Sequence, residues 1–514
     1  YEQGLVYRQK HPVFWCTECG SAIAKAETEE VERETKLNYL IFKVDGQDVE
    51  IATTRPEYLH ACVAVFVHPD DERYKDIVGK EAITPLGKKV PIMSDVDVDK
   101  EFGSGVVMVC TFGDKQDAVW VYRHNLPVID AIDERGRIIN AGPEYDGLTL
   151  IEVRKKVVED LKAKGLITKI ESLKQVVKIH DRCKRPVELR RSEQWFCKVD
   201  GFQRDIIRAA KEMKWYPDFT LQYLIDWTNY IEWDWVISRQ RYFGTPLPFY
   251  NCPNCGATKT ADPDKLPWKP ESAPKKVCDK CGAEMVPEQS VADVWIDSSI
   301  TPLIIAGWPD EGWERYYPST LRPQGVEIIR TWAFYTIYRS LVLTGKPPFR
   351  ELLLNGNVLG PDGRKMSKSL GNTVDPESLL RDYSADAVRM WAAFSGALAK
   401  DRPFNYQEMK FAQSFVVKVW NASSFVARAT EDYTEGSQPK LRAIDRWILF
   451  RLDRLKSEVT EAFERYDYYH AMSRLHHFFW HEFCDNYLEF VKYRVYGEDL
   501  ENKRAAQFLS LIHI

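Results

Sequence analysis

At 514 residues the chain is too long for a single hydrophobic core, so three or more domains are expected. Its 44% hydrophobic and 29% charged residues are ordinary for a globular protein. No apolar run approaches the roughly 18 residues of a membrane span, and residues 1–20 lack a signal-peptide pattern. The net charge of −5 neither demands nor excludes a nucleic-acid partner, because a basic face can be local.

Residues 37–129 have the pattern of β structure. Two strand-like runs, residues 37–44 and 47–54, flank Asp45-Gly46, which is a hairpin signal. Residues 62–67 and 105–110 are continuous apolar runs and predict buried strands. Helices are predicted at residues 151–165 and 201–213, and the basic run at residues 174–191 predicts a solvated surface.

The second half of the chain changes character twice. A Pro-, Lys- and Cys-rich insert with few apolar residues covers residues 251–288. Residues 320–395 alternate apolar strands and helices, as in α/β units, and the pattern beyond about residue 410 is all-helical. One helix there has an apolar stripe that we expect to form the core of a bundle, made by Ile444, Ile448, Leu452, Leu455, Val459 and Phe463.

Seven of the 11 cysteines stand in C-x-x-C or H-x-x-C pairs, which favours metal binding in a reducing cytosol over disulfides. One set of four has the spacing of a tetrathiolate zinc ribbon. Its members are Cys252, Cys255, Cys278 and Cys281.

A second metal site is predicted from two pairs far apart in the sequence, Cys16 with Cys19 and His180 with Cys183. Two such half-sites would clamp the base of the segment between them as a Cys₃His zinc site. The alternative is a set of free cysteines beside a surface histidine. The cysteines without a partner pattern are expected to be buried thiols, and these are Cys62, Cys110, Cys197 and Cys484.

The strongest chemical signal is the sequence Lys-Met-Ser-Lys-Ser at residues 365–369, with glycines at positions 363 and 371. A glycine-flanked loop with two lysines can bring positive charge onto a reacting phosphate and then withdraw. Two lysines alone would more simply indicate a solvated basic loop. The full pentapeptide favours a catalytic loop built from Lys365, Ser367 and Lys368.

These residues resemble the KMSKS signature of the class I aminoacyl-tRNA synthetases, whose catalytic domain is a Rossmann-like parallel sheet. The resemblance implies that Lys365 and Lys368 stabilise charge on the ATP phosphates while the amino-acid carboxylate attacks the α-phosphate. Met366 would lie beside the nucleotide, and Mg²⁺ would assist. Residues 352–359 resemble the family's last strand and adenine-binding turn, which implies that the base is contacted by Gly356, Asn357 and Val358.

Three further segments resemble the branched-aliphatic subgroup of this class, the valine, isoleucine and leucine enzymes. They are residues 234–240 (DWVISRQ), residues 293–299 (DVWIDSS), expected as a strand, and residues 325–332 (GVEIIRTW), expected as a helix start. In the subgroup two tryptophans sandwich the substrate side chain, which implies this role for Trp295 and Trp332. Two flat apolar walls measure a branched side chain and exclude water, although each tryptophan alone would indicate core packing. Gly325 and Glu327 would then contact ATP, with Glu327 at the ribose.

Residues 52–57, 101–105 and 113–117 resemble the editing domain inserted into the same enzymes, which hydrolyses the ester of a wrongly charged tRNA. The resemblance implies that Thr53, Thr54 and Arg55 hold the substrate near the terminal adenosine. Asp114 belongs to the same motif, and Asp117 would take the α-ammonium group, since a buried carboxylate facing a fixed cation is a sensible partner.

This segment departs from the family's pattern at two positions. Met108 stands where many bacterial valine-specific members have a lysine, and it is interpreted as core. Gly113-Asp114 stands where His-Asp precedes the final aspartate. A structural β-barrel without activity is the alternative interpretation.

Together these features predict a multidomain α/β protein. It would have a Rossmann-like parallel-sheet catalytic domain, an inserted β-barrel-rich editing domain, a zinc ribbon insert and a C-terminal α-helical bundle. The expected boundaries are 1–35 for a catalytic and connective segment, 36–175 for editing, 176–250 for the return, 251–288 for the ribbon, 289–410 for the rest of the catalytic domain, and 411–514 for an anticodon-binding bundle.

Residues 325–332 and 372–376 are closer to the valine-specific members than to the isoleucine-specific members. We therefore expect a cytoplasmic monomer that uses valine, ATP with Mg²⁺ and the tRNA for valine, and contains structural zinc. Editing of threonine-charged tRNA is expected because an apolar valine pocket cannot strongly reject threonine. The alternatives are an isoleucine-specific enzyme and a non-catalytic tRNA-binding paralogue. No H-I-G-H-like element precedes Cys16, so we expect the chain to begin downstream of that signature. We also expect the C-terminal helical bundle to be incomplete.

Overall fold

The computed structural model describes residues 1–231, 233–394, 396–434, 436 and 438–512. The chain divides into two compact units, which we describe separately. The first is Tyr1–Phe202 with Ile231–Ser299, and the second is Gln203–Tyr230 with Ile300–Ile514. No helix among the described residues is long and apolar enough to cross a membrane.

The first unit contains an antiparallel sheet from which a large β-rich insert extends. The strands are β1 (Val6–Cys16), β2 (Ser21–Ile23), β10 (Glu188–Cys197) and β12 (Trp235–Val236), in the order β12-β10-β1-β2. Strands β1 and β10 pair from Val6 opposite Cys197 to Trp15 opposite Glu188. Because the insert leaves after β2 and returns before β10, this sheet brings the two ends of the insert together.

The insert is a curled sheet of seven strands covered by two helices. Its order is β4-β3-β6-β7-β5-β8, with β9 also paired to β3, and β4 contacts β8, so the two ends of that order approach each other. Buried apolar side chains from the strands and from α2 fill one core. The elements are β3 (Thr28–Val44), β4 (Gln47–Thr53), β5 (Ala64–Val67), β6 (Glu81–Ile83), β7 (Lys89–Ser94), β8 (Val106–Val109), β9 (Ile167–His180), α1 (Lys115–Arg123) and α2 (Leu150–Ala163).

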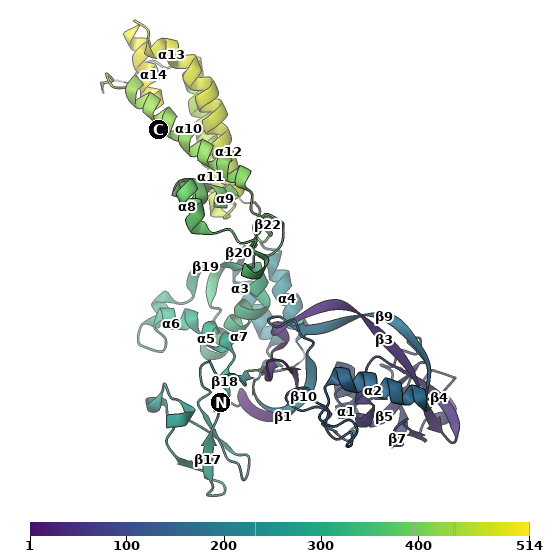
Figure 1. Cartoon of the computed structure of the whole chain (residues 1–514). Helices are drawn as coiled ribbons and strands as arrows, with labels where there is room; N and C mark the ends of the chain where they lie inside the picture. Colours follow the sequence, from purple (N-terminus) through teal and green to yellow (C-terminus); the bar gives the residue numbers. More distant parts are fainter. Residues whose placement is uncertain (232, 395, 435, 437, 513–514) are drawn as a thin grey trace. The chain divides into compact units, whose positions relative to one another are not determined.

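Strands β3 and β9 continue beyond this body as a two-stranded ribbon (Figure 1). The pairing runs from Thr28 opposite His180 to Leu40 opposite Ile167. The basic run predicted to be a solvated surface lies on β9 and β10 and in the turn between them, and its lysines pair across the ribbon with the acidic start of β3. Such exposed pairs contribute little stability each.

The local predictions for the insert are confirmed. Asp45 and Gly46, at φ of 51° and 82°, form the turn between β3 and β4, and the buried strands β5 and β8 lie within the two apolar runs. Helix α2 lies at the predicted helix of the insert, and α3 (Gln203–Glu212), in the second unit, lies at the other predicted helix. Met108 is buried in the core, as interpreted from the sequence. The expected boundary at residue 35 falls inside β3.

Residues 249–287 form a small four-stranded sheet with the order β15-β14-β17-β16. Its strands are β14 (Phe249–Asn251), β15 (Thr258–Thr260), β16 (Lys276–Val277) and β17 (Glu284–Pro287). On either side of it in the sequence, β13 (Ser238–Arg239) pairs with β18 (Val291–Ala292).

The strand expected at residues 293–299 is wrong, because these residues form the helix α5 (Val294–Ser299). The side chain of Asp293 accepts the Trp295 amide at 3.1 Å and its carbonyl accepts the Ile296 amide at 2.8 Å. An aspartate that binds the first free amides in this way starts a helix.

The second unit contains a three-stranded parallel sheet with the order β11-β20-β19, as expected for α/β units. Residues 358–359 and 402–403 add a short parallel pair beyond the end of β20. The elements are β11 (Lys214–Tyr216), β19 (Ser319–Gly325), β20 (Phe349–Asn355), β21 (Val358–Leu359), β22 (Arg402–Pro403), α3, α4 (Thr220–Tyr230), α6 (Thr301–Ala306) and α7 (Phe334–Thr344).

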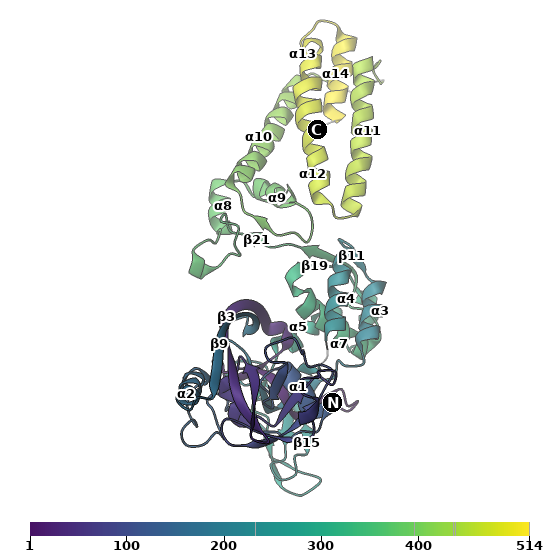
Figure 2. The same cartoon turned by 90° about the vertical axis from the view of Figure 1, so that its right-hand side faces the viewer.

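The rest of the second unit is helical, as predicted beyond residue 410. Figure 2 shows long helices running alongside one another, and buried apolar residues from α10, α11, α13 and α14 form their core. A π-helical segment, Phe478–Leu488, joins α12 to α13. The helices are α8 (Pro376–Asp382), α9 (Ala385–Phe394), α10 (Tyr406–Ala429), α11 (Ala443–Glu464), α12 (Tyr468–His477), α13 (Glu489–Val495) and α14 (Leu500–Ile512).

The predicted apolar stripe of α11 faces this core except at its end. Ile448 and Leu455 are buried and three neighbours pack against them, but Phe463 is 46% exposed. Over the distance from Ile444 to Phe463 an α-helix turns the side chain by about 100° away from its starting direction. The stripe has therefore rotated away from the core at its last member.

Candidate active and metal-binding sites

Residues 358–372, which we call the lysine hairpin, contain a tight turn at residues 360–364 followed by a 3-10 helix, Lys368–Leu370. Leu359 and Lys365 pair as an antiparallel bridge at its neck. Asn372 braces the loop from inside, because its Oδ1 accepts the Ser367 amide at 2.9 Å and its Nδ2 donates to the Asp362 carboxylate at 3.0 Å. The bond from Asn372 helps to lower the pKa of Asp362 to about 2.

The two signature lysines lie on the surface of this braced loop. The side chains of Lys365 and Lys368 are exposed, and neither has an ion-pair partner among the described residues. Between them Met366 packs against an apolar cluster that includes Leu379 and Met390. The hairpin is thus anchored by its methionine, while its lysines stay available to an anionic ligand.

The predicted adenine turn lies against a second segment of the chain. The Asn357 amide donates to the Asp401 carboxylate at 2.7 Å, and its carbonyl accepts the Arg402 amide at 2.9 Å. A Cβ on Gly356 would lie 1.9 Å from the Lys400 carbonyl, so only glycine fits there. Val358 is 45% exposed and remains open to a ligand.

Glu327 and Trp332 follow β19 and differ in their surroundings. The Glu327 carboxylate is exposed and lies over the Cα of Gly325, where an added Cβ would be 2.3 Å from its oxygen. Trp332 is only 6% exposed. Its ring is stacked on Phe349 at 5.6 Å, and the Arg322 guanidinium lies 4.1 Å from its centroid.

Trp295, in the first unit, follows a buried ionic cluster. Arg239 donates to Glu27 at 2.6 Å and to Asp293 at 2.7 Å, and all three side chains are at least nine-tenths buried. Trp235 donates its indole N–H to Asp293 at 2.9 Å. Burial raises the pKa of Asp293. Burial also acts to raise the pKa of Glu27, but Arg239, the Ala24 amide and Arg241 together outweigh it and lower that pKa. The cluster ties the start of α5 to the root of the insert.

The predicted editing residues gather around Arg55, at the end of β4. Its guanidinium donates to Glu57 at 2.7 Å, to Glu188 at 2.6 Å and to the Gly113 carbonyl at 3.4 Å. Thr53 accepts the Arg55 amide at 3.0 Å through its hydroxyl. Arg55 therefore joins two of the predicted segments, which are about 60 residues apart in the sequence.

Three residues that bind this cluster had no signal in the sequence, namely Tyr58, Arg154 and Glu188. The fully buried side chain of Glu57 also pairs with Arg154 of α2. The Tyr58 hydroxyl donates to Glu188 at 3.0 Å, and the Arg55 guanidinium lies 4.6 Å from the centroid of the Tyr58 ring. Local motifs gave no indication of Glu188 or Arg154, because both come from elements far along the chain.

Asp114 and Asp117 lie beside this cluster at the start of α1. Asp114 caps the helix, since its carboxylate accepts the Asp117 amide at 2.8 Å. The Asp117 carboxylate is buried and accepts the Cys110 amide at 3.2 Å. Burial, and then the charge of Asp114, raises the pKa of Asp117 well above its ordinary value. A cation bound here would be needed to keep the group ionised.

The small sheet at residues 249–287 brings the four predicted ribbon cysteines together. Their sulfurs lie within 4.8 Å of one another, with Cys252 to Cys281 at 3.4 Å and Cys255 to Cys278 at 3.5 Å. Four sulfurs about 2.3 Å from a tetrahedral metal lie about 3.8 Å apart. The Ala283 amide, and then the Asn254 side chain, lower the pKa of the Cys281 thiol to about 6, which favours the thiolate form that binds metal. The donor set fits a zinc ion.

The second predicted set also comes together, at the root of the insert. Cys16 lies 3.5 Å from Cys183, and both Cys19 and Cys183 face Nδ1 of His180, at 3.6 and 3.3 Å. Burial lowers the pKa of His180, so the imidazole is neutral and its Nδ1 can be a ligand. Its Nε2 lies 3.5 Å from an oxygen of Asp181, although neither atom makes a hydrogen bond within the described residues. This set fits one zinc ion as well.

The four ligand pairs share one turn. In each, the carbonyl of the first ligand accepts the amide of the residue four positions later, at 2.8–3.0 Å. That residue has φ between 56° and 73° in every case, a left-handed conformation that suits glycine. The four residues are Gly20, Lys184, Gly256 and Gly282.

The structure thus brings together each predicted metal set, the Arg55 and Asp117 segments, and the parts of the lysine hairpin. Trp295 belongs to the first unit and Trp332 to the second, so their pairing around a substrate stays a prediction. The cysteines expected to be buried thiols are buried, with exposures of 0–8% for Cys62, Cys110, Cys197 and Cys484.

Known proteins resemble the chain over nearly its whole length. Valine–tRNA ligase of Methanothermobacter thermautotrophicus is 49% identical over 99% of this chain and 58% of its own length. Valine–tRNA ligase of Methanocaldococcus jannaschii is 48% identical over 99% of this chain and 59% of its own length. The chain therefore spans less than two thirds of the curated relatives that it matches.

Two solved structures share the fold at 18% identity. The LeuRS–tRNA–LeuAMS ternary complex of Agrobacterium radiobacter K84 has a TM-score of 0.51 and covers 99% of this chain and 69% of the solved chain. Methionyl-tRNA synthetase of Mycobacterium tuberculosis with methionyl-adenylate has a TM-score of 0.50 and covers 65% and 61%.

Two family models match the sequence. The model for the anticodon-binding domain of tRNA ligase matches residues 445–513, within the helical part of the second unit. The model for tRNA synthetases of class I (I, L, M and V) matches residues 1–404, more than three quarters of the chain. With the lysine hairpin and the parallel sheet already described, this match establishes that the chain belongs to the class I tRNA synthetases of the isoleucine, leucine, methionine and valine group.

Proposed function

We propose that the natural gene product containing this chain is a valine–tRNA ligase, which activates valine with ATP and esterifies it to the tRNA for valine. The observation that carries the proposal is the braced hairpin with its two unpartnered lysines, in a chain 48–49% identical to proteins named valine–tRNA ligase. Identity at this level over 99% of the chain favours valine over isoleucine.

Amino-acid-dependent exchange of pyrophosphate into ATP tests the activity directly. Valine is expected to support exchange by the natural gene product far better than isoleucine, and the tRNA for valine is expected to be charged. Preferential activation of isoleucine would mean that the protein is an isoleucine-specific enzyme instead. No exchange with any amino acid would favour a non-catalytic tRNA-binding paralogue.

In this reaction a carboxylate oxygen of valine attacks the α-phosphorus of ATP, and the bond to pyrophosphate breaks. Lys365 and Lys368 neutralise the charge that develops on the phosphates, and Ser367 belongs to the same loop. Mg²⁺ would supply further charge neutralisation on the phosphate oxygens. The exposed positions of Lys365 and Lys368, on a hairpin anchored by Met366, support their role in neutralising this charge.

The remaining contacts to the substrates are proposals for the same site. Glu327, exposed above Gly325, would bind the ribose through its carboxylate, which has no partner in the part of the chain that the structure describes. Val358, in the turn with Gly356 and Asn357, would contact the adenine. Trp295 and Trp332 would bound the valine side chain, and the stacking of Trp332 on Phe349 supports a rigid wall.

We also propose that the insert hydrolyses threonine esterified to the same tRNA. In that reaction water attacks the ester carbonyl, and threonine and free tRNA leave. Asp117 would bind the α-ammonium group, and its burial beside Asp114 gives a site that a cation would stabilise. Thr53, Thr54 and Arg55 would orient the terminal adenosine, with Arg55 held by its carboxylate partners.

Two structural zinc ions complete the proposal. One would be held by the four cysteines of the ribbon, residues 251–288, and the other by the Cys₃His set at the root of the editing insert, residues 36–175. Both donor sets have the spacing of tetrahedral sites. The bundle, residues 411–514, would bind the anticodon arm of the tRNA, as the match to the anticodon-binding model supports.

A further inference from the structure

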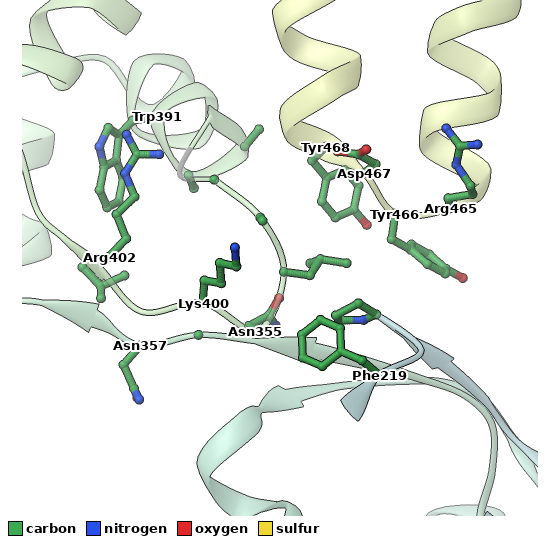
Figure 3. A pocket seen from close by; sticks show the side chains of 18 residues that line it. Phe219, Asn355, Asn357, Trp391, Lys400, Arg402, Arg465, Tyr466, Asp467 and Tyr468 are labelled. Atoms are coloured by element: carbon green, nitrogen blue, oxygen red, sulfur yellow. The ribbon is translucent and has the colours of Figure 1, made fainter. Parts of the chain in front are cut away.

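Four histidines lie on α12 and the π-helical segment that follows it, and two of them form a pair on the surface of the bundle. His477 is the last residue of α12, and His481 lies one turn further, inside Phe478–Leu488. Both imidazoles are more than half exposed, at 55% and 52%. Neither lines the cavity shown in Figure 3, which contains residues 356–358 and belongs to the proposed synthetic site.

This histidine pair has the spacing of two ligands of one metal. On a helix, residues four apart lie on the same face, and in helical zinc sites two histidines at this spacing bind a single ion. The ring centroids of His477 and His481 are 5.4 Å apart, and the ring planes are tilted by 53°. Two imidazoles whose nitrogens lie about 2.1 Å from one tetrahedral metal have centroids roughly 5 Å apart. The two rings therefore already have the separation that a shared metal would impose.

Asp485 orients one of the two imidazoles for a metal. One oxygen of its carboxylate lies 3.1 Å from Nδ1 of His481, and the other oxygen is held by Lys418 at 3.3 Å. A carboxylate beside Nδ1 accepts a hydrogen bond from that nitrogen, which leaves the lone pair of Nε2 for a ligand bond. Histidines that bind metals commonly have such a carboxylate partner.

Glu482 brings an oxygen beside the other imidazole. Its Oε1 lies 3.7 Å from Nε2 of His477, which is too long for a hydrogen bond. Two ligand atoms of one tetrahedral metal lie roughly 3.4 Å apart, so a metal can join these two atoms after a small movement. Arg451 donates to the same carboxylate at 2.6 Å and lowers its pKa, which keeps the group ionised.

The histidine pair differs from the two cysteine-containing sets in how completely its ligands are gathered. Among the described residues, only those two sets have three or more ligand atoms within 4.8 Å of one another. At the histidine pair the exposed imidazoles must turn towards the ion, and water completes its coordination. We propose that His477 and His481, with Glu482 as a third ligand, bind one exchangeable divalent ion of the zinc class, which imidazole nitrogens favour.

The bound ion would join two differently wound parts of the bundle. His477 ends α12, whereas His481 belongs to the π-helical segment, a rare conformation that is frequently found at functional sites. The opposite face of this segment contributes Phe483 and Tyr487 to the core of the bundle. An ion that binds only the folded arrangement stabilises it by mass action, so zinc should raise the melting temperature of the bundle.

Equilibrium dialysis against Zn²⁺ tests the proposal on chains freed of loosely held metal by gel filtration. The unaltered chain should bind one zinc ion more than His477→Ala and one more than His481→Ala. His470→Ala, an exposed histidine of α12, is the matched control and should bind as much zinc as the unaltered chain. Asp485→Ala should weaken binding of this ion about tenfold, because the His481 imidazole loses the partner that orients it.

These differences between chains identify the site whatever the occupancy of the cysteine-containing sets. Equal zinc content in the unaltered chain and in both pair variants would overturn the proposal, and loss of the ion in only one variant would overturn the pairing.

Modification of histidines by diethylpyrocarbonate, read by mass spectrometry on the unaltered chain, locates the ion without any substitution. Zn²⁺ should protect His477 and His481 and leave His470 reactive. Mg²⁺ should protect none of the three, because it prefers oxygen ligands. Equal modification of all three with and without Zn²⁺ would overturn the site.

Discussion

Arg239 donates a hydrogen bond of 2.7 Å to Asp293, and both side chains are almost wholly removed from water. Because the same guanidinium binds Glu27, its removal would leave two buried carboxylates without their cation. Arg239→Met is therefore expected to lower the free energy of unfolding by about 3–5 kcal/mol, measured by chemical denaturation.

The loss in the free energy of unfolding caused by Arg239→Met should become smaller as the pH falls, because protonation of Glu27 and Asp293 removes the uncompensated charges. Arg241→Met is the control. Arg241 lies 3.9 Å from Glu27 and is 25% exposed, so its loss should cost less than about 1 kcal/mol. Equal losses in the two variants would contradict the buried cluster as the source of stability.

Elemental analysis of the purified chain is expected to find two zinc ions. Cys278→Ser should reduce the content to one and unfold the ribbon locally, because metal binding supplies much of the folding energy of so small a sheet. Cys484→Ser, a buried cysteine of the bundle, should keep both ions. A single ion in the unaltered chain would remove one site, and none would contradict both.

Asp117→Asn is expected to abolish deacylation of threonine-charged tRNA, since the amide cannot pair with an ammonium group. The same change should raise the thermal stability. The pKa of Asp117 is raised in the folded state, so the wild-type carboxyl loses stability as the pH rises above its ordinary range, and the amide does not.

The gain in melting temperature of Asp117→Asn should therefore increase from pH 4 towards neutral pH. Asp76→Asn, an exposed carboxylate of the same insert, should change neither deacylation nor melting. A variant at position 117 that deacylates normally would remove Asp117 from the editing proposal.

Trp332→Phe should relax the choice between valine and isoleucine, because a smaller ring widens one wall of the proposed pocket. The difference of one methylene in an apolar pocket corresponds to roughly 1–3 kcal/mol, and the ratio of exchange rates for the two amino acids measures it. An unchanged ratio with lower stability would indicate that the ring only packs against Phe349 and Arg322.

Asn372→Ala should slow valine activation without removing a charge, because the amide of Ser367 and the carboxylate of Asp362 lose their common partner. Lys368→Ala should raise the activation free energy of valine activation by about 3 kcal/mol, which is comparable to the loss of one oxyanion donor. Pyrophosphate exchange at saturating ATP measures both. Wild-type rates in Asn372→Ala would show that the brace is not needed.

The sequence predicted the turns that depend only on neighbouring residues. Asp45-Gly46 specifies its turn through the φ > 0 that both positions require, and the glycine after each second cysteine of the ribbon favours the left-handed turn that follows a ligand pair. Lys184 adopts the same conformation at φ 56° without that signal, so its half-site was visible only as an H-x-x-C pair.

Long-range partners were not predictable from one sequence. Nothing near Arg55 indicates Glu188, and nothing near Asn357 indicates Asp401, because these contacts depend on how distant elements pack. The strand expected at residues 293–299 failed for a related reason. The capping role of Asp293 decides for a helix, and it depends on Arg239 and Trp235 holding that carboxylate in place.

The ribbon of β3 and β9 has a consequence for how such a chain arises. Because Thr28 stands opposite His180, residues 28–180 begin and end at adjacent points, and the strands that precede and follow them, β2 and β10, both pair with β1 in one sheet. A segment with neighbouring ends can be gained, exchanged or lost without rerouting its host, as in domain insertion. The insert therefore has the form of a domain that can be inserted into another protein, and the Cys₃His set lies at its point of attachment.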